Sequence, residues 1–215
     1  MRFEKSILAG VFIGIGGAVC SLCADKHIGA FMFGVGLYLV CVIGADLYTG
    51  KVGYLSENAN LAYIRYLVFV WAGNLTGAAC FGWLMRIAKP ELVPMATDTV
   101  VMRLGQPAYT TFVLAFFCGM LVHCAVYIYK TTGRLIGIFI CVPAFILCGF
   151  EHCVADMYIF ALAEVLTPVH LLVVTLGNTA GAIAANFVVP ARPHPRRVDN
   201  FNPGKATEFE DRNKL

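Results

Sequence analysis

Three ionisable side chains lie close together in an otherwise apolar stretch of the sequence, GFEHCVADMY at residues 149–158. Glu151, His152 and Asp156 are types of side chain that can hold a proton or bind a small charged solute. Residues 135–148, which precede them, contain no charged side chain. Burying charge in such surroundings is unfavourable, so we interpret these groups as serving or bracing a site inside a membrane.

Among the three, His152 is the side chain best suited to contact a solute. A neutral imidazole can donate one hydrogen bond to an anion without trapping it, as a fixed cation would. We expect Glu151 and Asp156 to cap backbone amides and to brace the chain at this point. Asp46, in GADLYTG at 44–50, is expected to brace the first half of the chain in the same way.

Four further polar side chains fall within or next to apolar segments. Asn74 and Asn178 lie in the middle of predicted spans, where an unpaired amide is unfavourable, so we expect them to bond to the backbone of interrupted helices. Thr49 can hydrogen-bond to His152 or to a solute if two such interruptions meet at the centre. His123, in the fourth predicted span, is a second histidine that could face the interior.

Bulky apolar side chains accompany these polar positions. Phe33 and Leu37 are four residues apart and share a helix face, and Phe145 precedes the second polar stretch by a similar distance. Large apolar groups on either side of a polar centre can form dry constrictions that block hydrated ions. The alternative is ordinary packing in the interior or against lipid.

The composition indicates the environment of these residues. The chain has 215 residues, of which 59% are hydrophobic and 13% are charged, whereas a soluble domain has about 25% charged residues. The surplus of apolar surface predicts an all-α polytopic membrane protein. Nearly all nine cysteines lie in apolar runs and are expected to act as small hydrophobic residues. Cys20 and Cys23 form a C-x-x-C pair, which keeps a membrane metal or redox enzyme open as an alternative, although we predict no enzyme, cofactor or metal.

The apolar runs predict six transmembrane helices. They cover 6–24, 28–45, 61–88, 108–130, 135–150 and 166–189. Shorter apolar pieces at 50–58 and 154–162 each follow a polar interruption inside a hydrophobic region. We therefore predict that two of the six helices are broken, which membrane proteins tolerate where the break is buried or lines a cavity.

An internal repeat relates the two halves of the sequence. GADLY at 44–48 is matched by VADMY at 154–158, and GNLTGA at 73–78 by GNTAGA at 177–182. Each half contains three predicted spans, so the two halves should be oppositely oriented. Inverted repeats with paired broken helices place a solute path near the middle of the membrane, which predicts transport. The paired glycines are expected to allow close helix packing.

The distribution of Lys and Arg predicts the orientation. Twelve of the 16 basic residues fall on the side of the predicted topology that holds both termini, so both termini are expected to be cytoplasmic in the inner (plasma) membrane. We predict one channel domain over 1–190, with repeats at about 5–90 and 107–190, and a flexible cytoplasmic tail over 191–215. Lipid and protons are expected partners, and nucleic acid is not.

Five motifs together resemble the formate/nitrite transporter family over about residues 5–190. They are AGVFIGIGG (9–17), GADLYTG (44–50), WAGNLTGA (71–78), GFEHCVADMY (149–158) and LGNTAGA (176–182). The resemblance implies a homopentamer with an aquaporin-like fold and one pore in each protomer. It also implies passage of small monovalent anions, often with a proton, and we expect formate first, then hydrosulfide or nitrite.

The resemblance also implies roles for individual residues. His152 is similar to the central histidine of the family, Thr49 to its loop threonine and Asn178 to its sixth-span asparagine. Phe33 and Phe145 are similar to one hydrophobic constriction, and Leu37, Leu47 and Val126 to the other.

Three positions depart from the family pattern. Pro107 stands where many members have a central lysine, His123 where the fourth span usually has Asn, and Asp156 where the second break usually has Asn. A missing cation and an added carboxylate both disfavour anions. A channel of the same fold for a neutral or weakly basic small solute is therefore the alternative function.

Overall fold

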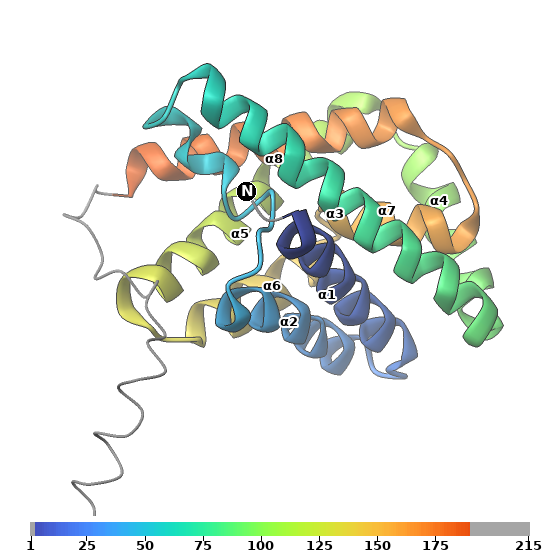
Figure 1. Cartoon of the computed structure of the whole chain (residues 1–215). Helices are drawn as coiled ribbons and strands as arrows, with labels where there is room; N and C mark the ends of the chain where they lie inside the picture. Colours follow the sequence, from blue (N-terminus) through green and yellow to red (C-terminus); the bar gives the residue numbers. More distant parts are fainter. Residues whose placement is uncertain (1–2, 190–215) are drawn as a thin grey trace, which may run out of the picture.

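The structure is a computed structural model that describes residues 3–189, and within this range all regular secondary structure is helical (Figure 1). The elements are α1 (Phe3–Leu22), α2 (Lys26–Ile43), the 3₁₀ helix η1 (Val52–Ser56), α3 (Leu61–Ala88), the 3₁₀ helix η2 (Pro90–Leu92), α4 (Val93–Leu104), α5 (Ala108–Thr132), α6 (Ile136–Leu147), α7 (Cys153–Ala163) and α8 (Pro168–Val188). The predicted all-α class is confirmed. The predicted tail over 191–215 lies outside the described residues.

Five of the described helices, α1, α2, α3, α5 and α8, are long and apolar enough to cross a membrane. The broken helix predicted from the segments at 135–150 and 154–162 is confirmed. It is the 12-residue helix α6, followed after a turn by the 11-residue helix α7. Helix α6 continues past Pro143 to Leu147, and the break follows at Gly149, whose left-handed conformation with φ 68° a continuous helix does not allow.

The first predicted break ends α2 but is not followed by a second half-helix. Gly44, with φ 72°, caps α2, and its N–H donates to the carbonyl of Val40. The apolar piece predicted over 50–58 contains only the five-residue η1. The chain must then reach Asn60, whose side chain caps α3, so too few residues remain for a helix of several turns.

A helix that the sequence analysis did not predict, α4, lies between α3 and α5. Its apolar character is interrupted by Asp98 and Arg103, which conceals it from a search for membrane-length apolar runs. It packs against α7 and buries Ala96 and Val100. This placement carries Arg103 towards the centre of the molecule.

The closest helix contacts depend on glycine. A Cβ atom added to Gly77 of α3 would overlap the backbone of Ile7 in α1, and one added to Gly181 of α8 would overlap the backbone of Phe116 in α5. Helices α1 and α3, and likewise α5 and α8, therefore pack backbone to backbone. The small residues of the two repeated motifs serve close packing, as the sequence predicted.

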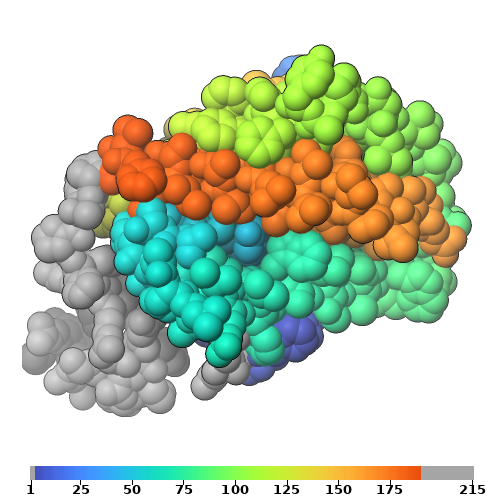
Figure 2. Space-filling view, turned by 90° about the horizontal axis from the view of Figure 1, so that it is seen from above, coloured from blue at the N-terminus to red at the C-terminus, as the bar shows by residue number. Residues whose placement is uncertain are grey.

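An apolar groove of about 930 Å³ separates α3 from α8. Figure 2 shows these two helices running side by side with a hollow between them. Two hydrogen bonds involve side chains that line it, from Trp71 Nε1 to Thr175 Oγ1 (3.1 Å) and between Tyr48 and Thr179 hydroxyls (2.8 Å). Many large apolar side chains are exposed on the outer faces of the helices, which suits a lipid environment.

Candidate functional site

Asn74 of α3 holds the first break through three hydrogen bonds. Its Oδ1 accepts from the backbone N–H of Tyr48 at 2.8 Å, and its Nδ2 donates to the carbonyl oxygens of Ser6 and Asp46, also at 2.8 Å. The side chain is fully buried. One amide therefore joins α1, α3 and the non-helical backbone that follows α2.

Asn178 of α8 holds the second break with the same set of bonds. Its Oδ1 accepts from the N–H of Cys153 at 2.9 Å, and its Nδ2 donates to the carbonyls of Ala115 and Glu151 at 2.8 Å each. It is likewise fully buried. Each of the two amides thus bonds to one helix carbonyl and to two backbone groups at a break.

These contacts correct the alignment of the two breaks. The motifs GADLY and VADMY pair Asp46 with Asp156, whereas the bonds to the asparagines pair Asp46 with Glu151 and Tyr48 with Cys153. The reason is that each asparagine amide bonds to backbone N–H and C=O groups, whose positions do not depend on the side chains that the motifs compare.

His152 and Thr49 bring the two breaks together. Thr49 Oγ1 lies 2.8 Å from His152 Nε2, and the backbone N–H of Ala155 donates to His152 Nδ1 at 3.2 Å. Nδ1 is an acceptor and therefore lacks a proton, so a neutral imidazole carries its proton on Nε2 and donates it to Thr49. His152 is 3% exposed and caps α7 at its N-terminus.

A small cavity of about 10 Å³ adjoins His152, which is room for about one water molecule. It is lined by Ile13, Phe33, Leu37, Leu47, Val122, Val142, Phe145 and His152. The ring of Phe145 stacks at 6.1 Å from that of His152 and meets Phe33 edge to face at 5.8 Å. A solute can pass only if these side chains move.

Four of the five predicted constriction residues lie around the cavity beside His152. Phe33, Leu37, Leu47 and Phe145 share this one cavity, while Val126 packs against Gly50 instead. The sequence analysis missed the lining residues Ile13, Val122 and Val142. Nothing distinguishes them in the sequence from other apolar residues of the same helices.

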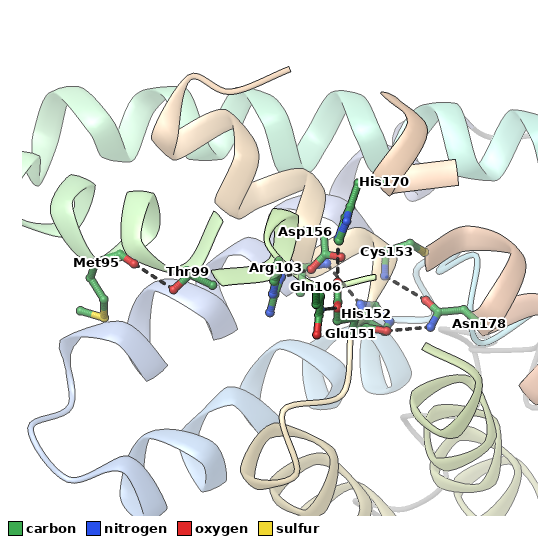
Figure 3. Close-up of polar contacts among 11 residues, drawn as sticks. Met95, Thr99, Arg103, Gln106, Glu151, His152, Cys153, Asp156, His170 and Asn178 are labelled. Atoms are coloured by element: carbon green, nitrogen blue, oxygen red, sulfur yellow. Dashed lines mark hydrogen bonds and ion pairs between the residues drawn. The ribbon is translucent and has the colours of Figure 1, made fainter. Parts of the chain in front are cut away.

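Within residues 3–189, Glu151 and Asp156 bond to side chains and not to backbone amides, which corrects the prediction for them. Asp156 forms an ion pair with Arg103, and Glu151 accepts from the side-chain amide of Gln106 (Figure 3). The other carboxylate oxygen of Glu151 lies 2.7 Å from His170 Nε2. The backbone cap that the sequence assigned to the carboxylates is made by His152.

We call Arg103, Gln106, Glu151, Asp156 and His170 the charged cluster. The carboxylates and His170 lie within 4.8 Å of one another, a spacing that suits a metal ion. Arg103 and Gln106 already bond to those carboxylates, so the arrangement is an ion-pair network rather than a metal centre. Arg103, Gln106 and His170 were missed because only the tertiary fold brings them to residues 151–156.

Asp46 and His123 lie apart from this cluster. Asp46 Oδ1 pairs with Lys51 Nζ at 3.0 Å, so its carboxylate braces the first break through a side chain and not through an amide. His123 is 1% exposed and packs against Gly53 and the ring of Tyr54 beside η1. It is not among the residues that line the His152 cavity.

Comparisons with known proteins agree with this geometry. Residues 2–191 match the model of the formate/nitrite transporter family. The nitrite transporter NirC of Escherichia coli is 30% identical, with 92% of this chain and 87% of the relative covered. A probable formate transporter of Methanothermobacter thermautotrophicus is 28% identical, with 82% of each covered.

Solved structures show a similar arrangement of helices. A pentameric formate channel with formate bound superposes with a TM-score of 0.71 at 25% identity, covering 86% of this chain and 92% of that one. An ion channel described as an FNT family member gives a TM-score of 0.74 at 24% identity, covering 87% and 90%. Matched over nearly its whole length and built around these two breaks, the chain belongs to the formate/nitrite transporter family, a family of membrane transporters and not of enzymes.

Proposed function

We propose that this member of the family carries small monovalent anions across the membrane, formate first, then hydrosulfide or nitrite, with coupling to protons. The observation that supports this most is the buried pair of Thr49 and His152 beside an apolar cavity of about 10 Å³. A nitrite transporter among the relatives and the formate bound to a similar channel point to the same class of solute.

Thr49 and His152 offer hydrogen bonds where an anion loses its water. The Nε2–H group of His152, which bonds to Thr49, can instead donate its hydrogen bond to a substrate oxygen. The Thr49 hydroxyl is then free to donate a second hydrogen bond to the substrate. Because the imidazole is uncharged, it does not hold the anion as a fixed cation would. The N-terminus of α7 adds a favourable dipole, whereas the five-residue η1 is too short to contribute one.

Proton transfer to the substrate would make a weak-acid anion neutral and ease its passage through the apolar constriction. His152 can release the Nε2 proton only if Nδ1 takes up another, because an imidazolate is not a stable product. Nδ1 already accepts from the N–H of Ala155. Proton transfer therefore breaks the cap of α7, which links the chemistry to the first turn of that helix.

A neutral or weakly basic solute is the second candidate. Two buried carboxylates, Glu151 and Asp156, favour it, as does Pro107 at the position of the family lysine. Arg103 supplies a cation from another element and pairs with Asp156, which offsets the added carboxylate. The anion is therefore the better-supported solute. Uptake of glycerol or methylammonium in place of formate would favour the second candidate.

We also infer the assembly and its orientation. The similar pentameric channel supports a homopentamer with a pore in each protomer. The channel domain spans 1–190 with oppositely oriented repeats over about 5–90 and 107–190. The excess of Lys and Arg on the side of the termini supports cytoplasmic termini in the inner (plasma) membrane. Native mass measurement in detergent tests the pentamer, and a stable monomer would contradict it.

The test of function is uptake of labelled formate into proteoliposomes at acidic and neutral external pH. His152→Asn keeps a donor but cannot titrate, so it should lose the increase in uptake at acidic pH while the assembly stays intact. His152→Phe should lose uptake at both pH values. His27→Asn is the matched control, because His27 is exposed in the first turn of α2, away from Thr49 and His152.

Two outcomes would contradict the proposal, one for the role of His152 and one for the solute class. An unchanged pH dependence in His152→Asn would show that this side chain only donates a hydrogen bond. Absence of formate, nitrite and hydrosulfide uptake by the unaltered protein would refute the proposed solute class.

A further inference from the structure

Three members of the charged cluster come from outside the second break. Arg103 is at the end of α4, Gln106 is in the connection to α5, and His170 is in the first turn of α8. All three meet the two carboxylates of the second break, as Figure 3 shows. Glu151 and Asp156 are 1% and 0% exposed, so their charges are compensated by protein groups and not by bulk water.

With both carboxylates ionised, the charges of the cluster balance only when His170 is an imidazolium. Two carboxylates contribute −2, the guanidinium of Arg103 contributes +1 and is always charged, and Gln106 is neutral. With a neutral His170 the cluster carries −1, and with an imidazolium it carries zero. The neutral cluster is therefore the one in which each buried carboxylate faces a cation.

The contacts of His170 place its ring beside both carboxylates. Its Nε2 lies 2.7 Å from Glu151 Oε2, and Phe160 of α7 covers its ring edge to face at 5.6 Å. The Asp156 carboxylate is also within 4.8 Å, and among the described residues its Oδ2 has no hydrogen-bond partner. An imidazolium at this place therefore faces both carboxylates.

Other titratable groups near the cluster are already engaged or uncharged. On α5, Cys118 is buried and interacts electrostatically with both carboxylates, but it has no charge as a thiol. Beyond α7, Glu164 pairs with Arg86 of α3 at 2.9 Å. His152 is bonded to Thr49 and to the backbone of α7.

We propose that His170 is a second proton-binding group of the transport path, and that its protonation sets the net charge of the charged cluster next to His152. Glu151 is adjacent to His152 in the chain, so an unbalanced negative charge at the cluster opposes an anion at the Thr49–His152 pair. When His170 takes up a proton, the charged cluster becomes neutral and no longer repels an anion at the Thr49–His152 pair. The inference rests on the proposed transport of anions, and it assigns His170 a positioning role through charge, not contact with the substrate.

The test compares variants at one pH, so that protonation of the substrate is the same for all of them. Formate exchange is measured in proteoliposomes with equal pH inside and outside, at pH 5.5 and at pH 8.5. At pH 5.5, His170→Gln should reduce exchange about tenfold, the effect of one charge acting on another about 10 Å away at an effective dielectric constant of about 20. At pH 8.5, Glu151→Gln should raise exchange by a similar factor, because it removes the unbalanced charge.

The double variant Glu151→Gln/His170→Gln distinguishes charge from structure. Its cluster is neutral at both pH values, so its exchange should exceed that of His170→Gln at pH 5.5 and that of the unaltered protein at pH 8.5. His27→Gln, at an exposed position in the first turn of α2, should change neither rate. Should His170→Gln fail to assemble, Glu151→Gln at pH 8.5 still decides the question.

Two results would overturn the inference. One is a double variant no faster than His170→Gln, and the other is a Glu151→Gln variant with no gain at pH 8.5. If the unaltered protein exchanges formate in either case, the proposed function stands and only the role of His170 fails. If the unaltered protein exchanges no anion at all, both fail.

Discussion

Replacement of Asn178 by Leu should destabilise the protein strongly, because one side chain holds the second break. Leu has a similar volume but neither donates nor accepts hydrogen bonds. The change removes the bond from the N–H of Cys153 and the two bonds to the carbonyls of Ala115 and Glu151. These groups are buried, so water does not replace the lost partner.

The magnitude follows from those three bonds. A side-chain hydrogen bond between membrane helices contributes about 0.6 kcal/mol on average and at most about 1.7 kcal/mol. Three bonds therefore correspond to about 2–5 kcal/mol of unfolding free energy. The upper part of this range is expected, because the Glu151 carbonyl and the Cys153 N–H lie at a break in the helices. Asn74→Leu should lose a similar amount, since Asn74 makes the same three kinds of bond.

The measurement is reversible unfolding in mixed micelles with a rising fraction of SDS, followed by tryptophan fluorescence. Thr76→Ala is the matched control, because Thr76 is exposed and its hydroxyl only bonds to the carbonyl of Ala72 in the same helix. The control should lose less than about 0.5 kcal/mol. Equal stability of Asn178→Leu and Thr76→Ala would refute the view that the amide holds the break.

Three further predictions concern packing, capping and the constriction. Gly77→Ala should force α3 away from the backbone of Ile7, so the yield of assembled protein should fall in size-exclusion chromatography, whereas a normal yield would contradict the packing described. The first backbone N–H groups of α2 donate to the carboxylate of Asp25 and lower its pKa. The ionised carboxylate therefore stabilises the helix at neutral pH, and this stabilisation is lost as the pH falls below about 4. The melting temperature of Asp25→Ala should therefore be lower than that of the unaltered protein at pH 7 and approach it in acid, and a constant difference would be inconsistent. Phe33→Ala should enlarge the cavity beside His152 and speed the entry of larger monocarboxylates into proteoliposomes, and unchanged selectivity would argue against a role in the constriction.

The sequence predicted the elements whose signals are local. Long apolar runs gave the bounds of α3 as 61–88, and these are the bounds that the structure has. The positions of the two breaks were also evident, because glycine and charged residues interrupt apolar segments there. The two halves of the second broken helix, predicted at 135–150 and 154–162, are observed as α6 and α7. The same reasoning was wrong for 50–58, where the nearby start of α3 leaves room only for η1, and it overlooked α4 because that helix is neither long nor uniformly apolar.

The asparagines and the central histidine were recognisable because a polar group in a membrane-length segment requires a partner. Their partners were only partly predictable: Thr49 was expected for His152, but the amide of Ala155 was not. For Glu151 and Asp156 the sequence suggested backbone caps, and the structure instead provides Arg103, Gln106 and His170. By itself the sequence determined which side chains could not be left unpaired, since that depends on polarity and local surroundings. Only the tertiary structure decided which distant groups pair with them, because the packing of α4 and α8 against the second break brings those groups within hydrogen-bonding distance.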